Sequence, residues 1–264
     1  MNLNHYEAIV IGSGATGGIT ALTLAEKGLN VLIIEAGPKI KREEASVNEP
    51  RDTFNRIIGV MSKKHLKQSQ HPGYWKNNPS LYANELNHSY TNPENKPFIW
   101  TQGKHYGGKS LTWGGITLRF SPQDFKPADQ DNYGPNWPIC YEDLRPHYDY
   151  IEELLGVYGN KDNLEQVPDG KYVGKIPLTN EELNFGKVIQ KKLNYPFIQS
   201  RGFDKNSAAK TKNWPKSSSI GSTIKKALET GRVHILDNHM VESFETNKET
   251  QLAKKVKIIN LKNG

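Results

Sequence analysis

One pattern in the first forty residues fixes how this chain begins to fold. An apolar run, Ala8–Ile11, breaks into the glycine-rich turn GSGATGG and a helical pattern, and a second apolar run, Val31–Ile34, ends in Glu35. Short β-branched runs on either side of a helical segment predict two parallel strands joined by that helix. The sequence therefore predicts a βαβ unit in a mixed α/β fold.

The glycines of that turn have the spacing G-x-G-x-x-G, at Gly12, Gly14 and Gly17. In a dinucleotide-binding turn the first allows a sharp bend, the second lets the backbone approach a pyrophosphate, and the third lets the helix pack closely. The N-terminus of the helix then offers N–H groups and a positive dipole end to the phosphates. Glu35 stands where a carboxylate accepts hydrogen bonds from ribose hydroxyls and repels the 2′-phosphate of NADP. The motif alone does not separate FAD from NAD.

Composition excludes several other classes of protein. The 264 residues carry a formal charge of +7, but their lysines form scattered doublets without interleaved aromatics, so no nucleic-acid partner is expected. No apolar run approaches the roughly 20 residues of a membrane span. The lone Cys140 forbids an internal disulfide, and the histidines lack metal-ligand spacing, so no metal is expected. Because the N-terminus runs directly into a strand, we expect a cytoplasmic location.

A second glycine-rich stretch covers residues 103–115, with five glycines among Ser110, Thr112 and Trp113. Such a backbone can press against a flat ligand while it exposes hydrogen-bond donors. On its own, the stretch fits an ordinary glycine-rich loop with a packed tryptophan equally well. Between the two glycine-rich stretches, residues 39–97 show weak periodicity and predict an irregular segment that covers a cofactor or substrate site.

Regular elements return in the second half of the chain. Leu144, Tyr148, Ile151 and Leu155 share one face of a helix with Pro146 near its first turn, and residues 181–193 predict another helix. A serine run, 217–222, predicts the cap of a helix that ends at Gly231. Strands are expected at 233–236, 240–245 and 256–261, and the first of these returns to the nucleotide sheet.

Taken together, these stretches resemble the N-terminal half of a glucose-methanol-choline (GMC) flavin oxidoreductase, and more closely the sugar and polyol dehydrogenases and pyranose oxidases. The matching motifs are the first glycine turn with Glu35, the G-G-x-S pattern at Gly107–Ser110, and W-P-I-x-Y-E-D-L at Trp137–Leu144. The resemblance implies a Rossmann-like FAD-binding domain interleaved with an α+β substrate domain. It assigns 1–126 to the FAD-binding domain with its cover segment and flavin loop, 127–214 to the substrate domain, and 215–264 to the return to the FAD-binding domain.

The resemblance also implies a cofactor site. The FAD-binding residues would be Gly12, Gly14, Ala15, Thr16, Gly17, Glu35, Ala36, Gly107, Gly108, Ser110, Thr112, Trp113, Gly114 and Val241. Some relatives join a loop histidine covalently to the flavin, whereas this chain has Thr112 there, so we expect dissociable FAD. The implied reaction is hydride transfer from a carbon of an alcohol, sugar or polyol substrate to flavin N5. The electron acceptor stays unknown.

The chain ends in an Asn-Gly pair, Asn263–Gly264, directly after the last expected strand. Asn-Gly predicts a hairpin turn whose second strand is missing, so we expect a C-terminally truncated sequence. The resemblance places the catalytic histidine in the missing half, and no catalytic residue is assigned here. We expect the fragment alone to be inactive. Two alternatives stay open at this point: an NAD-dependent dehydrogenase, and a nucleotide-binding remnant without chemistry.

Overall fold

The computed structural model describes residues 5–204 and 213–262, which form two compact units. The first unit contains residues 5–113 and 213–262, and the second contains residues 114–204. Residues 114–126, which the sequence analysis assigned to the FAD-binding domain, lie in the second unit. The functional roles given to these segments stay predictions. The expectations for residues 205–212, and for the Asn-Gly pair at 263–264, lie outside the described residues.

The first unit contains a three-stranded parallel sheet with the order β1-β2-β3. Its strands are β1 (Ala8–Ile11), β2 (Val31–Ile34) and β3 (Val233–Leu236). Val31 in the central strand lies opposite Ala8 on one side and Val233 on the other. All four residues of β2 are buried, as expected of a strand between two others. The predicted βαβ unit and the predicted return of the chain to this sheet are both confirmed.

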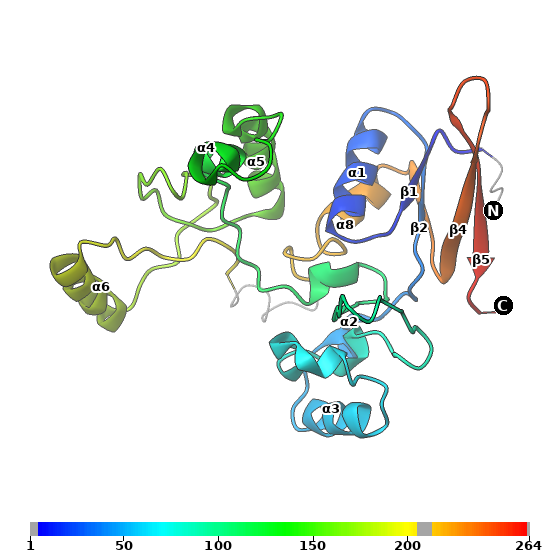
Figure 1. Cartoon of the computed structure of the whole chain (residues 1–264), viewed down its shortest axis with the longest axis horizontal. Coiled ribbons are helices and arrows are strands. Elements are labelled where there is room, and N and C mark those ends of the chain that lie inside the picture. Colours follow the sequence, from blue (N-terminus) through cyan, green and yellow to red (C-terminus); the bar gives the residue numbers. More distant parts are fainter. Residues whose placement is uncertain (1–4, 205–212, 263–264) are drawn as a thin grey trace. The chain divides into compact units, whose positions relative to one another are not determined.

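Two helices, α1 (Ala15–Glu26) and α8 (Thr223–Glu229), pack against each other on one face of this sheet (Figure 1). A Cβ atom on Gly18 would lie 2.3 Å from the Thr223 hydroxyl oxygen, so only glycine permits this close approach. Leu22 and Ile224 are almost fully buried, and each contributes about 1.5–3 kcal/mol by leaving water. One detail of the prediction was wrong: Ser222 does not cap α8, because its hydroxyl donates to the Ser218 carbonyl oxygen instead.

A two-stranded antiparallel hairpin, β4 (His239–Thr246) and β5 (Ala253–Asn260), follows β3 almost at once. Figure 1 shows it on the opposite side of the sheet from α1 and α8. The two strands predicted here are confirmed. The backbone N–H of His239 donates to the Glu35 carbonyl oxygen at 3.0 Å, so the start of β4 is attached to the end of β2.

The segment from residue 39 to 97 is more regular than the sequence indicated. It contains α2 (Arg42–Ala45), α3 (Arg51–Met61) and the short 3₁₀ turns η1 (Gln68–Gln70), η2 (Pro72–Trp75) and η3 (Pro79–Leu81). The expectation of an irregular segment was therefore wrong for α3. Its apolar residues recur at helical spacing, but they are largely exposed, and the helix is held instead by polar contacts of buried Arg56 with the Asn77 carbonyl and with Glu49.

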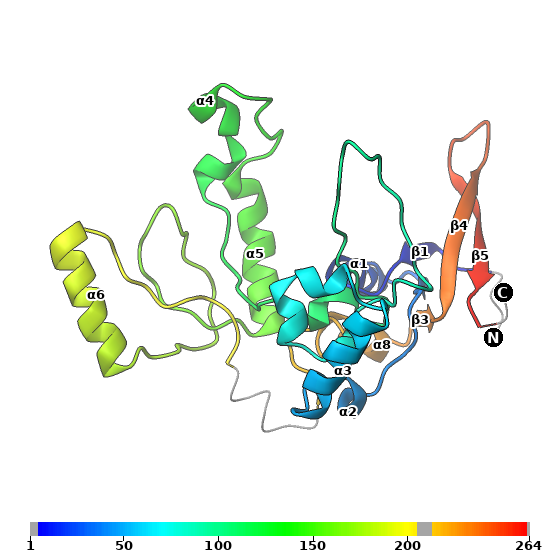
Figure 2. The same ribbon diagram turned by 60° about the horizontal axis from the view of Figure 1, so that its bottom comes forward.

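The second unit is built from helices and long connections (Figure 2). The helices are α4 (Pro127–Asp131), α5 (Tyr141–Leu155) and α6 (Asn180–Leu193), and a 3₁₀ turn η5 (Pro122–Phe125) precedes α4. The helix predicted at 181–193 is confirmed, whereas α5 begins before the expected face and therefore contains Pro146 in its interior. Residues 114–204 form no strand, only isolated bridges such as Tyr158 with Gly202. Among the described residues, no helix has both the length and the apolar character needed to cross a bilayer.

Candidate functional site

The glycine turn after β1 leaves open space in front of α1. Gly12 has a φ of +91°, a left-handed conformation that favours glycine. A Cβ atom on Gly14 would meet nothing within 4 Å, whereas one on Gly17 would lie 1.9 Å from the Gly12 carbonyl oxygen. The turn is therefore packed tightly against the helix on one side and open on the other.

The N-terminus of α1 is free to bind an anion. No side chain caps it, and its first turn carries no acidic residue. The first N–H groups of a helix have no acceptor within the helix, and the helix dipole places partial positive charge beside them. Together with the open space at Gly14, these groups form the kind of cradle in which a pyrophosphate binds.

Glu35 presents a carboxylate at the end of β2, only 7% exposed. One of its oxygens accepts hydrogen bonds from the Ser13 N–H at 2.8 Å and the Ser13 hydroxyl at 2.6 Å, and the other accepts from the Gly37 N–H at 2.7 Å. These three donors fix the orientation of the group. A carboxylate accepts about four hydrogen bonds, so this one retains capacity for a ribose hydroxyl.

The second glycine-rich stretch lies against the first. The N–H of Gly107 donates to the Ser13 hydroxyl oxygen at 2.9 Å, across 94 residues of sequence. Gly107 has a φ of +90°, and it precedes the 3₁₀ turn η4 (Gly108–Leu111). A Cβ atom on Gly108 would lie 3.4 Å from the Cα atom of Gly14. The structure thus brings together the turn predicted to hold the pyrophosphate and the loop predicted to face the flavin.

Buried serines connect these two segments to the loop before α8. The Ser110 hydroxyl donates to the Gly107 carbonyl oxygen at 2.6 Å and accepts from the Ser219 N–H at 3.0 Å. The Ser219 hydroxyl donates to the Ser13 carbonyl oxygen at 2.8 Å. Ser13 and Ser219 were not predicted as site residues. Ser13 lies inside the glycine motif, and the serine run that contains Ser219 was interpreted as a helix cap.

The other predicted cofactor residues occupy varied positions. Ala15 and Thr16 are exposed in the first turn of α1, and Ala36 is half-buried after Glu35. Thr112 is half-buried, and the Trp113 indole N–H donates to the Ser217 carbonyl oxygen at 3.0 Å. Val241 is half-buried in β4, and Gly114 is the first residue of the second unit. Their roles toward FAD stay predictions.

Two histidines of the first unit, His105 and His88, are engaged by neighbouring groups. Both ring nitrogens of buried His105 face carbonyl oxygens, of Tyr106 at 3.1 Å and Leu81 at 3.0 Å, and burial lowers its pKa. The His88 Nδ1 atom lies 2.8 Å from the Lys104 ammonium, and burial lowers the pKa of His88 as well. Within residues 5–204 and 213–262, no three His, Cys, Asp or Glu side chains gather as metal ligands would.

The fold and this site define a dinucleotide-binding α/β domain. Residues 7–46, which contain β1, the glycine turn, α1, β2 and Glu35, match a family model described as an FAD binding domain. The match favours FAD over NAD, which the motif alone did not decide.

Curated relatives extend the likeness beyond that segment. The chain is 25% identical to the fructose dehydrogenase large subunit of Gluconobacter japonicus over 183 residues, which are 68% of this chain and 32% of the relative. It is 29% identical to paromamine 6'-oxidase of Streptomyces fradiae over 160 residues, which are 60% of this chain and 24% of the relative. The chain therefore spans about a third or less of the relatives that it matches. These relatives are GMC-type oxidoreductases, which confirms the predicted resemblance.

Solved structures support the fold. A formate oxidase of Aspergillus oryzae RIB40 superposes with a TM-score of 0.52 at 14% identity, over 100% of this chain and 44% of the oxidase. At this identity the likeness concerns the fold alone. The predicted fold class, an α/β FAD-binding domain with a parallel sheet, is confirmed.

Proposed function

We propose that this chain is the FAD-binding part of an oxidoreductase that acts on the CH–OH group of an alcohol, sugar or polyol. The observation that carries the proposal is the pairing of the open, uncapped N-terminus of α1 with the buried Glu35 carboxylate at the end of β2. The first group suits a pyrophosphate and the second suits a ribose. Support for the substrate class comes from the relatives' names, which include a fructose dehydrogenase and a paromamine 6'-oxidase.

The residues of the chain would hold the cofactor from two sides. The N–H groups at Gly14, Ala15 and Thr16 would bind the pyrophosphate, and the Glu35 carboxylate, oriented by Ser13 and Gly37, would bind the ribose. The Ser110 hydroxyl is already engaged by Gly107 and Ser219. The backbone of Gly107–Ser110, rather than this hydroxyl, would therefore face the flavin ring.

We propose that the FAD is held without a covalent bond. Thr112 occupies the loop position at which some members of the family carry the histidine that is joined to the flavin, and its side chain has no ring nitrogen for such a bond. Noncovalent binding would then depend on the hydrogen bonds of the glycine turn and of Glu35.

Bound FAD supplies a hydride acceptor for the alcohol carbon. Oxidation of an alcohol also needs a group that takes the hydroxyl proton, and histidine suits that task at neutral pH. The contacts of His105 and His88 leave neither of them as a candidate, so the proposal assigns no catalytic base within the described residues.

Anaerobic reduction of the flavin in the purified natural protein tests the proposal. D-fructose, a polyol and a primary alcohol would be added in turn, with an alkylamine and a carboxylic acid that lack hydroxyl groups on carbon chains as chemically distinct controls. We expect at least one of the first three to bleach the flavin absorption, and a deuterium label on the oxidised carbon to slow the bleaching. Flavin that no CH–OH compound reduces, but that NADH reduces, would contradict the substrate class.

The same sample tests the alternative of an NAD-dependent dehydrogenase. In that case the protein would be colourless and NAD would bind in a calorimetric titration.

We further propose a cytoplasmic location, which rests on the sequence alone and which cell fractionation would test.

A further inference from the structure

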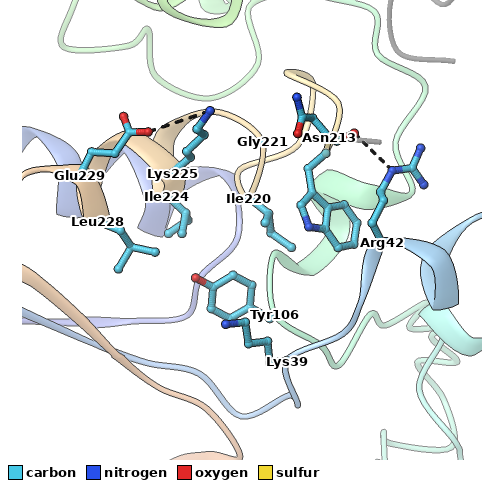
Figure 3. A pocket seen from close by; sticks show the side chains of 11 residues that line it. Lys39, Arg42, Tyr106, Asn213, Ile220, Gly221, Ile224, Lys225, Leu228 and Glu229 are labelled. Carbon is cyan, nitrogen blue, oxygen red and sulfur yellow. Dashed lines mark hydrogen bonds and ion pairs between the residues drawn. The ribbon is translucent and has the colours of Figure 1, made fainter. Parts of the chain in front are cut away.

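A separate pocket of about 550 Å³ opens beside α8, on the first unit (Figure 3). Its walls come from three stretches: the segment after β2, Tyr106, and residues 213–229. None of the predicted FAD-binding residues lines it, although Tyr106 directly precedes Gly107. Its volume lies within the range of roughly 300–1,000 Å³ typical of small-molecule sites.

Cationic groups line the rim of this pocket. Lys39, Arg42 and Lys225 contribute positive charge, and one acidic residue, Glu229, lies 3.9 Å from the Lys225 ammonium. The Arg42 guanidinium donates one hydrogen bond to the Ser46 hydroxyl and another to the Asn213 carbonyl oxygen. The Asp237 carboxylate lies close by, because it accepts the Lys39 backbone N–H at 3.1 Å. The side chains that line the pocket nevertheless carry net positive charge and complement an anion.

Two donors in the pocket have no partner in the described part of the chain: the Tyr106 hydroxyl and the Lys39 ammonium. Figure 3 shows the Tyr106 hydroxyl pointing toward the side of the pocket where Ile224 and Leu228 lie. Tyr106 is 6% exposed, and burial raises its pKa to about 12, so the hydroxyl keeps its proton at neutral pH. The Tyr106 hydroxyl can therefore donate a hydrogen bond to a ligand in the pocket.

The remaining surface of the pocket is apolar and aromatic. Ile220, Ile224 and Leu228 come from α8 and the loop before it. The indole of Trp214 lies 5.7 Å from the Arg42 guanidinium carbon, which holds the ring in place by a cation–π contact. A flat apolar ring system would stack on an aromatic side chain and be buried from water here, next to the cationic rim.

We propose that this pocket binds a small aromatic anion: a planar ring system that carries one carboxylate, sulfonate or phosphate group. The anionic group lies at Lys39, and the ring system lies between Trp214 and the apolar residues of α8 and the loop before it. This site is distinct from the FAD site and does not depend on the proposed oxidoreductase activity.

The probe for a test is 8-anilinonaphthalene-1-sulfonate, an aromatic sulfonate whose fluorescence rises on binding. N-phenyl-1-naphthylamine, which has the same rings without the sulfonate, serves as the neutral control probe. The test variant is Lys39→Gln with Arg42→Gln. The matched control is Lys248→Gln with Lys255→Gln, which removes the same charge from exposed positions of the β4–β5 hairpin. Flavin absorption of every sample is recorded alongside.

We expect one saturable site for the sulfonate in the unaltered protein. Its dissociation constant should rise about tenfold or more in the Lys39/Arg42 variant, because each charge-assisted contact is worth about that factor. The hairpin control should bind as the unaltered protein does, and the neutral probe should bind weakly to all. If the double variant fails to fold, the single variant Lys39→Gln tests the proposal, because Lys39 is exposed and its replacement should not disturb folding. Lys39→Gln should still weaken binding of the sulfonate several-fold.

Two outcomes would overturn the proposal. Equal affinity of the sulfonate for the Lys39 variants and the hairpin control would show that the pocket does not recognise the anion. Neutral-probe affinity as high as that of the sulfonate would show an apolar patch without charge recognition. Neither outcome bears on the flavin spectrum, so failure here is distinguishable from failure of the proposed FAD function.

Discussion

Replacing Gly14 by alanine should separate cofactor binding from folding. The φ and ψ of Gly14, −67° and −166°, lie in a region open to any residue, and the new methyl group would meet nothing within 4 Å. The polypeptide should therefore tolerate it. The methyl group would, however, occupy the open space in front of the N-terminus of α1, where we place the pyrophosphate.

The size of the effect on folding and the size of the effect on FAD binding both follow from these contacts. An alanine in place of a glycine that caps a helix costs less than about 1 kcal/mol of folding free energy. A hydrogen bond between an N–H group and a charged acceptor contributes about 1.5–3 kcal/mol. Displacing the pyrophosphate from one such N–H should therefore weaken FAD binding roughly 10- to 100-fold.

Gly17→Ala is the contrasting variant, because its methyl group would lie 1.9 Å from the Gly12 carbonyl oxygen. The turn and the helix must then separate, which should destabilise the first unit by roughly 1–3 kcal/mol. FAD titration of the apoprotein, followed by flavin fluorescence, and urea unfolding measure the two properties. The reasoning is refuted if Gly14→Ala binds FAD like the unaltered protein, or if it unfolds as readily as Gly17→Ala.

Three further predictions follow from the buried polar groups. Glu35→Gln should weaken FAD binding about tenfold or more, since the amide N–H₂ would face the N–H or hydroxyl donors that now hold the carboxylate; unchanged titration would contradict this. Arg119→Leu should destabilise the second unit by about 3–5 kcal/mol, because it leaves Glu152 buried without its cation, and adding Glu152→Gln should restore part of the loss in urea unfolding. Burial lowers the pKa of His65 below its usual 6.5, so the unfolded chain takes up that proton more readily. This contribution to stability should thus be complete well above the unfolded pKa of about 6.5 and be lost as the pH falls through that value, and His65→Gln should flatten the fall.

The sequence predicted those parts of the fold that depend on local patterns. The apolar runs that form β1, β2 and β3 are short and bounded by glycine, asparagine or charged residues, and the glycine spacing predicted the turn between β1 and α1. Helix α3 was missed although its apolar residues recur at helical spacing, because it lies in a stretch in which proline and polar residues interrupt the pattern.

Long-range hydrogen bonds explain what the sequence could not predict about the site. Ser13 reaches Glu35 and Gly107, and Ser219 reaches Ser110 and Ser13, across separations of 22 to 206 residues. A serine in a glycine turn and another in a serine run have local explanations, as turn former and helix cap. Only the folded chain reveals that their hydroxyls hold the two glycine segments together.

The most direct test of the central claim is the absorption spectrum of the purified natural protein before and after acid precipitation. We predict a yellow protein whose flavin passes entirely into the acid supernatant, with the mass of FAD. A colourless protein that binds NAD instead would contradict the assignment of the cofactor. Flavin that stays with the precipitate would contradict noncovalent binding and the role given to Thr112.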